Sequence, residues 1–247
     1  MGNTKDRSNA NQGPVLVVGA SSGIGLETIR RLREQDTEVY AISRTAPDEF
    51  MQLGVKHLAF DVTGDEMASV KAFLPERLSG LVYGPGTITL KPFQGLKIED
   101  YRLDLEINLL GGVKILQVSL PALRKGAPAS VVFFSTVASG VGMSYHASIA
   151  AAKSAVEGFA LSTAAELARS NIRVNVVAPS LTDTRLAENL LSTDQKRESS
   201  ADRHPLKRYG QPEDIARTVV FLLNEASGWL TGQIIGVDGG LSRLRPL

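Results

Sequence analysis

The chain of 247 residues contains no cysteine, which excludes disulfide bonds, thiolate metal ligands and cysteine nucleophiles. Its three histidines, His57, His146 and His204, are too widely spaced to predict a zinc site, which needs several converging ligands. Charge of one sign is also lacking, because 27 Lys and Arg residues balance 26 Asp and Glu residues to a net charge of +1. Without a basic excess we expect neither a nucleic-acid nor a membrane partner.

Long hydrophobic runs are absent as well. No stretch of about 18 uncharged apolar residues occurs, so no transmembrane span is predicted. Residues 1–13 are polar and lack the apolar core of a signal peptide, so we expect a disordered tail and a cytoplasmic protein. Hydrophobic residues nevertheless make up 43% of the chain, enough for a folded core, and residues 14–247 are expected to form a single domain.

Strand-like and helix-like segments alternate along the whole domain. Short apolar runs predict strands at 15–18, 38–42, 55–60, 80–83, 130–134, 172–178 and 234–237. Helical spacing predicts helices at 26–34, 65–74, 98–120, 144–169 and 212–223, the third of which is expected to stop before Pro121. This alternation predicts an α/β fold with a parallel sheet covered on both faces. Residues 180–208 are polar and irregular, and their length predicts a substrate lid rather than a passive loop.

A glycine-rich turn lies between the first predicted strand and the first predicted helix. Gly19, Gly23 and Gly25 form the pattern G-x-x-x-G-x-G, and Ser21 and Ser22 add hydroxyl donors. Glycines at such a turn let the backbone approach a pyrophosphate, and the helix N-terminus presents free N–H groups to it. The position after a strand and before a helix therefore predicts dinucleotide binding.

The end of the second predicted strand indicates which nicotinamide nucleotide binds. An acidic residue at this point would hold the ribose 2′-hydroxyl of NAD, but the sequence has Ser43 followed by Arg44. An uncharged side chain removes repulsion toward a 2′-phosphate, and a guanidinium suits phosphate geometry. The pair predicts NADP(H) as the cofactor.

Several further residues complete a family pattern: Asp61-Val62, Asn108, Ser135-Thr136, Lys153, Pro179 with Thr184, and the final Val237-Asp238-Gly239-Gly240. Together with the glycine turn, they resemble the short-chain dehydrogenase/reductases, and especially the ketoacyl-carrier-protein reductase-like members, over residues 14–241. The resemblance implies a Rossmann-type doubly wound sheet of seven parallel strands in the order 3-2-1-4-5-6-7. It also implies an oxidoreductase with a small-molecule substrate that forms a homodimer or homotetramer.

The resemblance also assigns site residues. Cofactor contacts fall on Gly19, Ser21, Ser22, Gly23, Ile24 and Gly25 at the pyrophosphate, Asp61 and Val62 at the adenine, Gly84 and Gly86 after the fourth strand, and Pro179, Leu181, Thr182 and Thr184 at the carboxamide and phosphates. Asn108 matches the residue that anchors a proton-relay water, and Lys153 matches the lysine that binds the nicotinamide ribose. One departure is Tyr83-Gly84-Pro85-Gly86, which stands where the family usually has Asn-Asn-Ala-Gly.

The larger departure concerns the proton donor. The family pattern is Tyr-x-x-x-Lys, and counting back four residues from Lys153 gives Ile149, which cannot donate a proton. Thr136, with Ser135 beside it, falls at the position of the serine that stabilises the substrate oxygen, and its hydroxyl can do the same.

Two residues before Ile149 offer a replacement acid. Tyr145 and His146 lie about one turn earlier on the predicted helix, and a phenol or an imidazole can protonate a substrate. We therefore expect an NADPH-dependent reductase of a carbonyl or activated C=C substrate with Tyr145 or His146 as an atypical acid. The alternative is a catalytically silent NADP-binding sensor or assembly protein.

Overall fold

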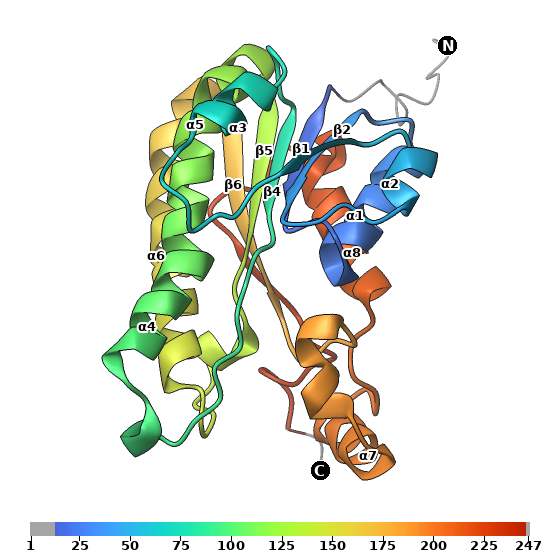
Figure 1. Ribbon diagram of the computed structural model, residues 1–247. Helices are drawn as coiled ribbons and strands as arrows, with labels where there is room; N and C mark the ends of the chain where they lie inside the picture. The colour runs from blue at the N-terminus through green and yellow to red at the C-terminus, as the bar shows by residue number, and fades with distance from the viewer. Residues whose placement is uncertain (1–12, 246–247) are drawn as a thin grey trace.

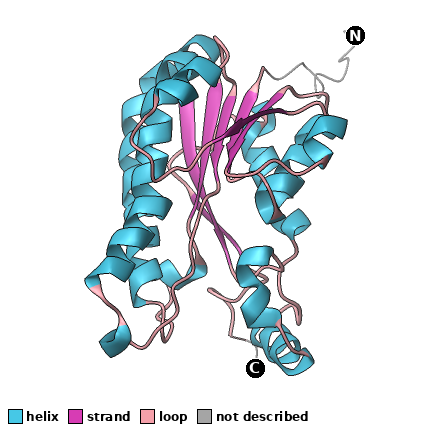
Figure 2. Ribbon diagram, in the orientation of Figure 1, coloured by secondary structure: helices cyan, strands magenta, loops and turns pink. Residues whose placement is uncertain are grey.

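The computed structural model describes residues 13–245, which form a seven-stranded sheet with helices on both faces (Figures 1 and 2). The strand order is β3-β2-β1-β4-β5-β6-β7, and every neighbouring pair is parallel. This order confirms the predicted Rossmann-type doubly wound sheet. The predicted tail lies outside the described residues apart from Gly13, whose carbonyl accepts a hydrogen bond from Ser79 Oγ at 2.5 Å.

Every predicted strand is present, with bounds within one residue of those predicted. The strands are β1 (Val15–Val18), β2 (Val39–Ser43), β3 (Lys56–Ala59), β4 (Gly80–Tyr83), β5 (Ala129–Phe134), β6 (Ile172–Pro179) and β7 (Ile234–Val237). The α-helices are α1 (Gly23–Glu34), α2 (Glu49–Gln52), α3 (Ala68–Phe73), α4 (Ile98–Leu105), α5 (Gly111–Gly126), α6 (Ala147–Leu167), α7 (Asp194–Arg203) and α8 (Pro212–Leu223). Shorter turns are η1 (Phe93–Gly95), η2 (Glu106–Leu110), η3 (Val137–Ser139), η4 (Ala168–Ser170), η5 (Arg185–Leu191) and η6 (Glu225–Ser227); η2 is a π-helical turn and the others are 3-10 turns.

Two apolar layers hold the helices to the sheet. Along β1, Leu16 and Val18 belong to the layer beneath α5 and α6, whereas Val15 and Val17 belong to the layer beneath α1 and α8. All four side chains are at most 1% exposed. Parallel strands buried on both faces are continuous apolar runs, which is why the short runs in the sequence located them.

The predicted helix 98–120 differs most from prediction. It does not stop before Pro121 but continues as α5 to Gly126, and η2 interrupts it. α5 buries Leu116 before the proline and Leu123 after it in the same apolar layer, so packing outweighs the missing N–H of Pro121.

The predicted lid is also more regular than expected. Residues 180–208 contain η5 and α7, and α7 begins after Thr193, whose hydroxyl accepts a hydrogen bond from the N–H of Lys196. His204 is buried at the end of α7, with Nδ1 2.7 Å from the carbonyl of Ser200 and Nε2 2.8 Å from Ser180 Oγ. These contacts fix the end of α7 to Ser180, directly after β6.

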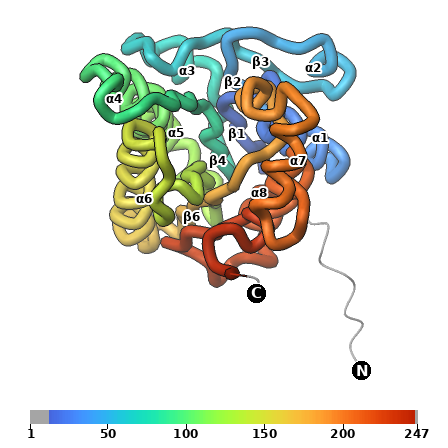
Figure 3. The backbone as a smooth tube through the Cα atoms, turned by 90° about the horizontal axis from the view of Figure 1, so that it is seen from below, coloured from blue at the N-terminus to red at the C-terminus, as the bar shows by residue number. Residues whose placement is uncertain are grey.

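The carboxyl ends of the strands lie at the lower edge of the sheet in Figure 1, between α4 and α7. Figure 3 views this edge from below, with α4 and α6 on one side and α7 and α8 on the other. Ligands of open parallel sheets bind at this edge. Within residues 13–245, no helix combines the length and the apolar character that crossing a membrane requires.

Candidate active site

The glycine turn has the geometry of a phosphate-binding loop. Gly19 has a φ of +78°, and a Cβ there would lie 2.6 Å from the backbone N of Pro85. A Cβ on Gly25 would lie 2.3 Å from the carbonyl oxygen of Gly19. Glycine is therefore required at both positions, and the turn packs directly against the segment after β4.

The N-terminus of α1 is open to an anion. Ser22 is the N-cap residue but its side chain makes no capping hydrogen bond, and the first turn carries no acidic residue. A helix with uncapped N–H groups at its positive end suits a pyrophosphate. The residues present therefore fit the dinucleotide that the sequence predicts, with Ser21 and Ile24 flanking the same turn.

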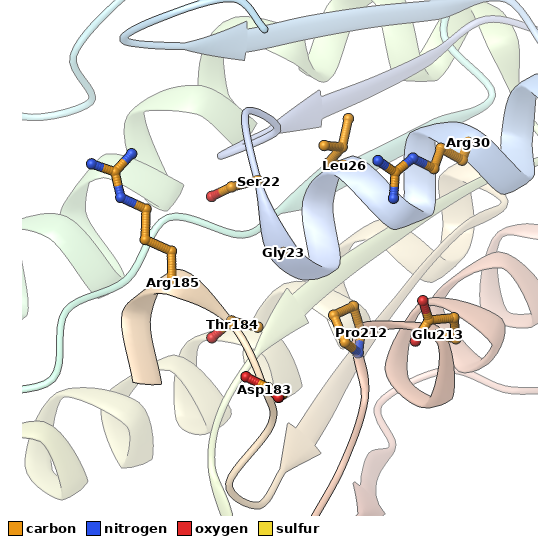
Figure 4. A pocket seen from close by; sticks show the side chains of 9 residues that line it. All are labelled: Ser22, Gly23, Leu26, Arg30, Asp183, Thr184, Arg185, Pro212 and Glu213. Carbon is orange, nitrogen blue, oxygen red and sulfur yellow. The ribbon is translucent and has the colours of Figure 1, made fainter. Parts of the chain in front are cut away.

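A cleft of about 330 Å³ opens beside this helix end. Figure 4 shows Ser22 and Gly23 on one side of it and Thr184 and Arg185, from the predicted lid, on the other. A Cβ on Gly23 would lie 3.1 Å from Cγ2 of Thr184, so the lid touches the glycine turn. Arg185 of the predicted lid thus lines the cleft beside the predicted pyrophosphate site.

The end of β2 presents Arg44 to solvent while Ser43 is buried. Ser43 Oγ donates to the carbonyl of Thr45 at 2.8 Å and lies 3.0 Å from Nε2 of His57. Hydrogen bonds from Thr63 lower the pKa of Asp61, and the charge of Arg44 contributes to the same shift. Arg44 and Asp61 therefore share one edge of the sheet, where the sequence predicts the adenosine.

Lys153 on α6 and Asn108 on η2 lie together at the end of β4, in a region that we call the corner of β4, α4 and α6. Lys153 Nζ is buried and donates to the carbonyl of Phe134 at 2.9 Å. Burial lowers the pKa of Lys153 to about 8, and the charge of Asp104 opposes this shift. A Cβ on Gly86 would lie 3.7 Å from Lys153 Nζ and 3.2 Å from Asn108 Oδ1, so both polar atoms face Gly86.

The π-helical turn η2 positions Asn108. Such turns inside α-helices are frequent at functional sites. Tyr83 donates to the carbonyl of Ile107 at 2.6 Å and so ties this turn to the end of β4. Tyr83 is thus a buried anchor at one of the positions where the family usually has an amide.

Ser135 and Thr136 follow β5 as predicted but differ in their contacts. Ser135 Oγ donates to Glu157 Oε1 at 2.5 Å, and Ser139 Oγ donates to the same oxygen at 2.5 Å. Thr136 Oγ1 accepts a 3.3 Å hydrogen bond from the N–H of Ala138, which leaves its own proton uncommitted. Thr136 is therefore better suited than Ser135 to hydrogen-bond a substrate.

The start of α6 carries the two predicted acids. Tyr145 is 59% exposed and has a φ of +70°. This backbone conformation is uncommon for a bulky residue, and residues that adopt it cluster at functional sites. His146 is half-buried with Nδ1 2.7 Å from the carbonyl of Ser144. Ile149 is 4% exposed, so an aliphatic side chain is buried one turn before Lys153.

The remaining predicted residues lie at the same sheet edge. Val62 follows β3, and Gly84 directly follows β4 and donates its N–H to the carbonyl of Val18. Beyond Pro179 and Leu181, Thr182 forms an isolated parallel bridge to Gly210. The structure therefore brings the predicted cofactor residues to one edge, and their roles stay predictions.

Sequence reasoning missed a buried carboxylate beside this corner. Asp104 is 0% exposed and accepts hydrogen bonds from Thr87, Thr89 and Ser148. Its signal in the sequence was its position four residues before Asn108, which places both on one face of a helix.

These features define a class of protein: it has a Rossmann-type fold, and the edge at the carboxyl ends of its strands fits a nicotinamide dinucleotide. A family model described as enoyl-(acyl carrier protein) reductase matches residues 19–242. The chain belongs to the short-chain dehydrogenase/reductase family of oxidoreductases.

Similar proteins agree with this assignment. The chain is 33% identical over 238 residues to the 3-oxoacyl-[acyl-carrier-protein] reductase FabG of Thermotoga maritima, covering 92% of this chain and 96% of that protein. Its fold is similar to that of the ligand-free aldohexose dehydrogenase of Thermoplasma acidophilum, with a TM-score of 0.89, 27% identity and coverage of 97% and 98%. It is also similar to the structure of ElxO with NADP bound, with a TM-score of 0.84, 25% identity and coverage of 93% and 98%.

Proposed function

We propose that this chain is an NADPH-dependent oxidoreductase that reduces a carbonyl or activated C=C bond of a small molecule. The convergence of Lys153 Nζ and Asn108 Oδ1 on Gly86 carries the proposal, because the segment after β4 that contains Gly86 packs against the glycine turn. Lys153 would hold the ribose of the bound nucleotide, whose reduced nicotinamide would supply the hydride, and Thr136 would donate a hydrogen bond to the substrate oxygen. The relative FabG supports an acyl thioester as one substrate class to test.

The preference for NADPH rests on Arg44. Because Ser43 Oγ donates to Thr45 and lies within hydrogen-bond distance of His57, the exposed guanidinium is the group that meets the 2′-phosphate. Arg44→Ala should weaken NADPH binding about 10-fold, the worth of one charge-assisted contact, and leave NADH binding unchanged. Ser43→Asp should reverse the preference. Calorimetric titration of both variants with both nucleotides is the test, and equal losses for NADPH and NADH would contradict this assignment.

The proton donor is proposed at the start of α6, from Tyr145 or His146. The test is NADPH oxidation at 340 nm with a panel of ketones and enoyl thioesters, for the wild type, Tyr145→Phe and His146→Ala. Removing a general acid typically costs about 10²- to 10⁴-fold in turnover, so one of the variants should lose at least about 100-fold. Full turnover in both would remove these two residues from the proposed mechanism.

Association of subunits is part of the same proposal. Three leucines on the helices that resemble the pairing helices of the family are between 45% and 60% exposed. They are Leu103, Leu110 and Leu161. Light scattering should give a dimer or tetramer, and the mass of a single chain would contradict it.

A further inference from the structure

Asp104 is a fully buried carboxylate next to the proposed active site. Oδ1 accepts from Thr87 Oγ1 at 2.5 Å and from Thr89 Oγ1 at 3.1 Å, and Oδ2 accepts from Ser148 Oγ at 2.6 Å. Three hydroxyl donors suit an ionised carboxylate, which only accepts. Among residues 13–245 no cation lies within ion-pair distance of Asp104. A buried charge without an ion-pair partner is costly, so its presence beside Lys153 calls for a physical reason.

The hydrogen bonds of Asp104 fix the orientation of Asn108. Thr87 has one hydroxyl proton, and Asp104 Oδ1 receives it, so Thr87 Oγ1 can only accept from Asn108. Asn108 Nδ2 accordingly donates to Thr87 Oγ1 at 2.9 Å and to the backbone carbonyl of Asp104 at 2.8 Å. Asn108 Oδ1 must then point the other way, where it is buried and has no donor among the described residues. It faces Gly86, as Lys153 Nζ does.

Asp104 also lies beside Lys153. Ser148, which donates to Asp104, is on α6 five residues before Lys153, and Thr87, which also donates to it, follows Gly86, which faces Lys153 Nζ. Ile149 puts an aliphatic side chain on the helix face where a phenol would otherwise accompany the lysine, so no negative or polar group comes from that position. The ammonium of Lys153 keeps one backbone acceptor, the carbonyl of Phe134. The carboxylate of Asp104, on α4, is a negative charge that can take the place of the polar group missing at Ile149.

The other ionisable groups around Lys153 are engaged elsewhere. On α6, Glu157 receives the hydroxyls of Ser135 and Ser139, and His146 pairs through Nδ1 with a backbone carbonyl. On η2, Glu106 binds Lys114 Nζ at 2.8 Å. From the sheet, the group that meets Nζ is a carbonyl. Asp104, which is tied to α6 by the hydrogen bond from Ser148, is thus the carboxylate left to favour the charged form of Lys153.

We propose that Asp104 is a positioning residue of this active site, which places a negative charge beside Lys153 and turns the carbonyl oxygen of Asn108 toward Gly86. The proposal rests on the proposed function for its catalytic meaning, but the charge coupling that it invokes can be measured in the protein without nucleotide. Asp104 touches neither substrate nor cofactor. It acts through Lys153 and Asn108.

The first test measures Lys153 directly. The ε-carbon resonances of 13C-labelled lysines are followed against pH in the protein without nucleotide, and the Lys153 signal is assigned by its loss in Lys153→Arg. In Asp104→Asn, Lys153 should deprotonate about one pH unit or more lower than in the wild type, the usual effect of removing a close opposite charge. Asp100→Asn is the matched control, because Asp100 lies one turn earlier on α4 but pairs with Lys91. An unchanged Lys153 titration in a folded Asp104→Asn variant would overturn the proposal.

The second test separates charge from packing. If the ammonium holds the nucleotide ribose, Asp104→Asn should bind NADPH at least about fivefold more weakly at pH 8 and close to normally at pH 6, where Lys153 is protonated again. A purely structural defect would weaken binding equally at both pH values and would overturn the charge role. Thr87→Val should leave the Lys153 titration and NADPH affinity unchanged but lower kcat about 10-fold, because Asn108 is no longer held. Normal kcat in Thr87→Val would overturn the orienting role.

The two levels of proposal fail differently. If the wild type binds no NADPH at any pH, the proposed function is wrong, yet the lysine titration still decides whether Asp104 controls Lys153. If NADPH binds and the titration does not move, the proposed function stands and the role of Asp104 is wrong.

Discussion

The β1–α1 turn and the corner formed by β4, α4 and α6 retain the family pattern to different degrees. At the turn, the predicted glycines are present and two of them are required by contacts with backbone atoms. At the corner, Lys153 and Asn108 remain, but Ile149, Tyr83 and Asp104 surround them with different chemistry. The geometry for holding a nucleotide is thus fixed by the backbone, whereas the proton chemistry depends on side chains that can be exchanged. Substitutions in each region should therefore have effects of different size and kind.

The largest effect is expected at the turn. In Gly25→Ala, the new Cβ would lie 2.3 Å from the carbonyl oxygen of Gly19, and backbone cannot yield as a flexible side chain can. The loop must shift, and NADPH affinity should fall by at least about 100-fold, roughly 3 kcal/mol. Fluorescence titration with NADPH measures it.

Gly95→Ala is the control for that substitution, because a Cβ on Gly95 meets nothing within 4 Å. Its NADPH affinity should equal that of the wild type. If Gly25→Ala bound NADPH within about threefold of the wild type, the turn would not be the nucleotide site.

The next effect tests the cost of burying charge at the corner. Burial lowers the pKa of Lys153 from 10.5 to about 8 in the folded protein. Between these pH values the unfolded chain binds a proton that the folded chain does not, so the free energy of unfolding rises with pH. The gain is absent below pH 8 and should reach about 2 kcal/mol by pH 10.

Lys153→Met lacks this titration while sharing every other ionisable group, so it isolates the contribution of Lys153. Urea unfolding of both proteins at pH 7.5, 9 and 10 gives the comparison. The free energy of unfolding of the wild type should rise with pH relative to that of the variant. Parallel profiles would mean that burial does not lower the pKa of Lys153.

The same contrast explains which parts the sequence could predict. Strands such as Val15–Val18 were predictable because burial on both faces leaves an apolar run, and the glycine turn because few residues fit its backbone. Pro121 misled the helix prediction because the local rule ignores packing on both sides of it. Asp104 escaped because nothing in a charged residue on a helix reveals that three hydroxyls from two other segments surround it.

The smallest effect compares a tyrosine of the corner with a tyrosine on β2, outside both regions. Tyr83 is 2% exposed and its hydroxyl donates to the carbonyl of Ile107, whereas the hydroxyl of Tyr40 accepts from the exposed side chain of Lys56 at 2.8 Å. Tyr83→Phe leaves a carbonyl of η2 without this donor and should lower the free energy of unfolding by about 1 kcal/mol. Tyr40→Phe should cost about 0.5 kcal/mol or less, since water replaces its contact.

Thermal or urea unfolding of these two variants, with NADPH affinity measured alongside, completes the comparison. The affinity should be unchanged in both, because neither hydroxyl lies among the proposed nucleotide contacts. Equal stability losses for Tyr83→Phe and Tyr40→Phe would mean that the hydroxyl of Tyr83 does not hold η2 in place. Asn108 would then owe its position to the hydrogen bonds of Thr87 and Asp104 alone, and the stability losses of Tyr83→Phe and Thr87→Val would simply add in the double variant.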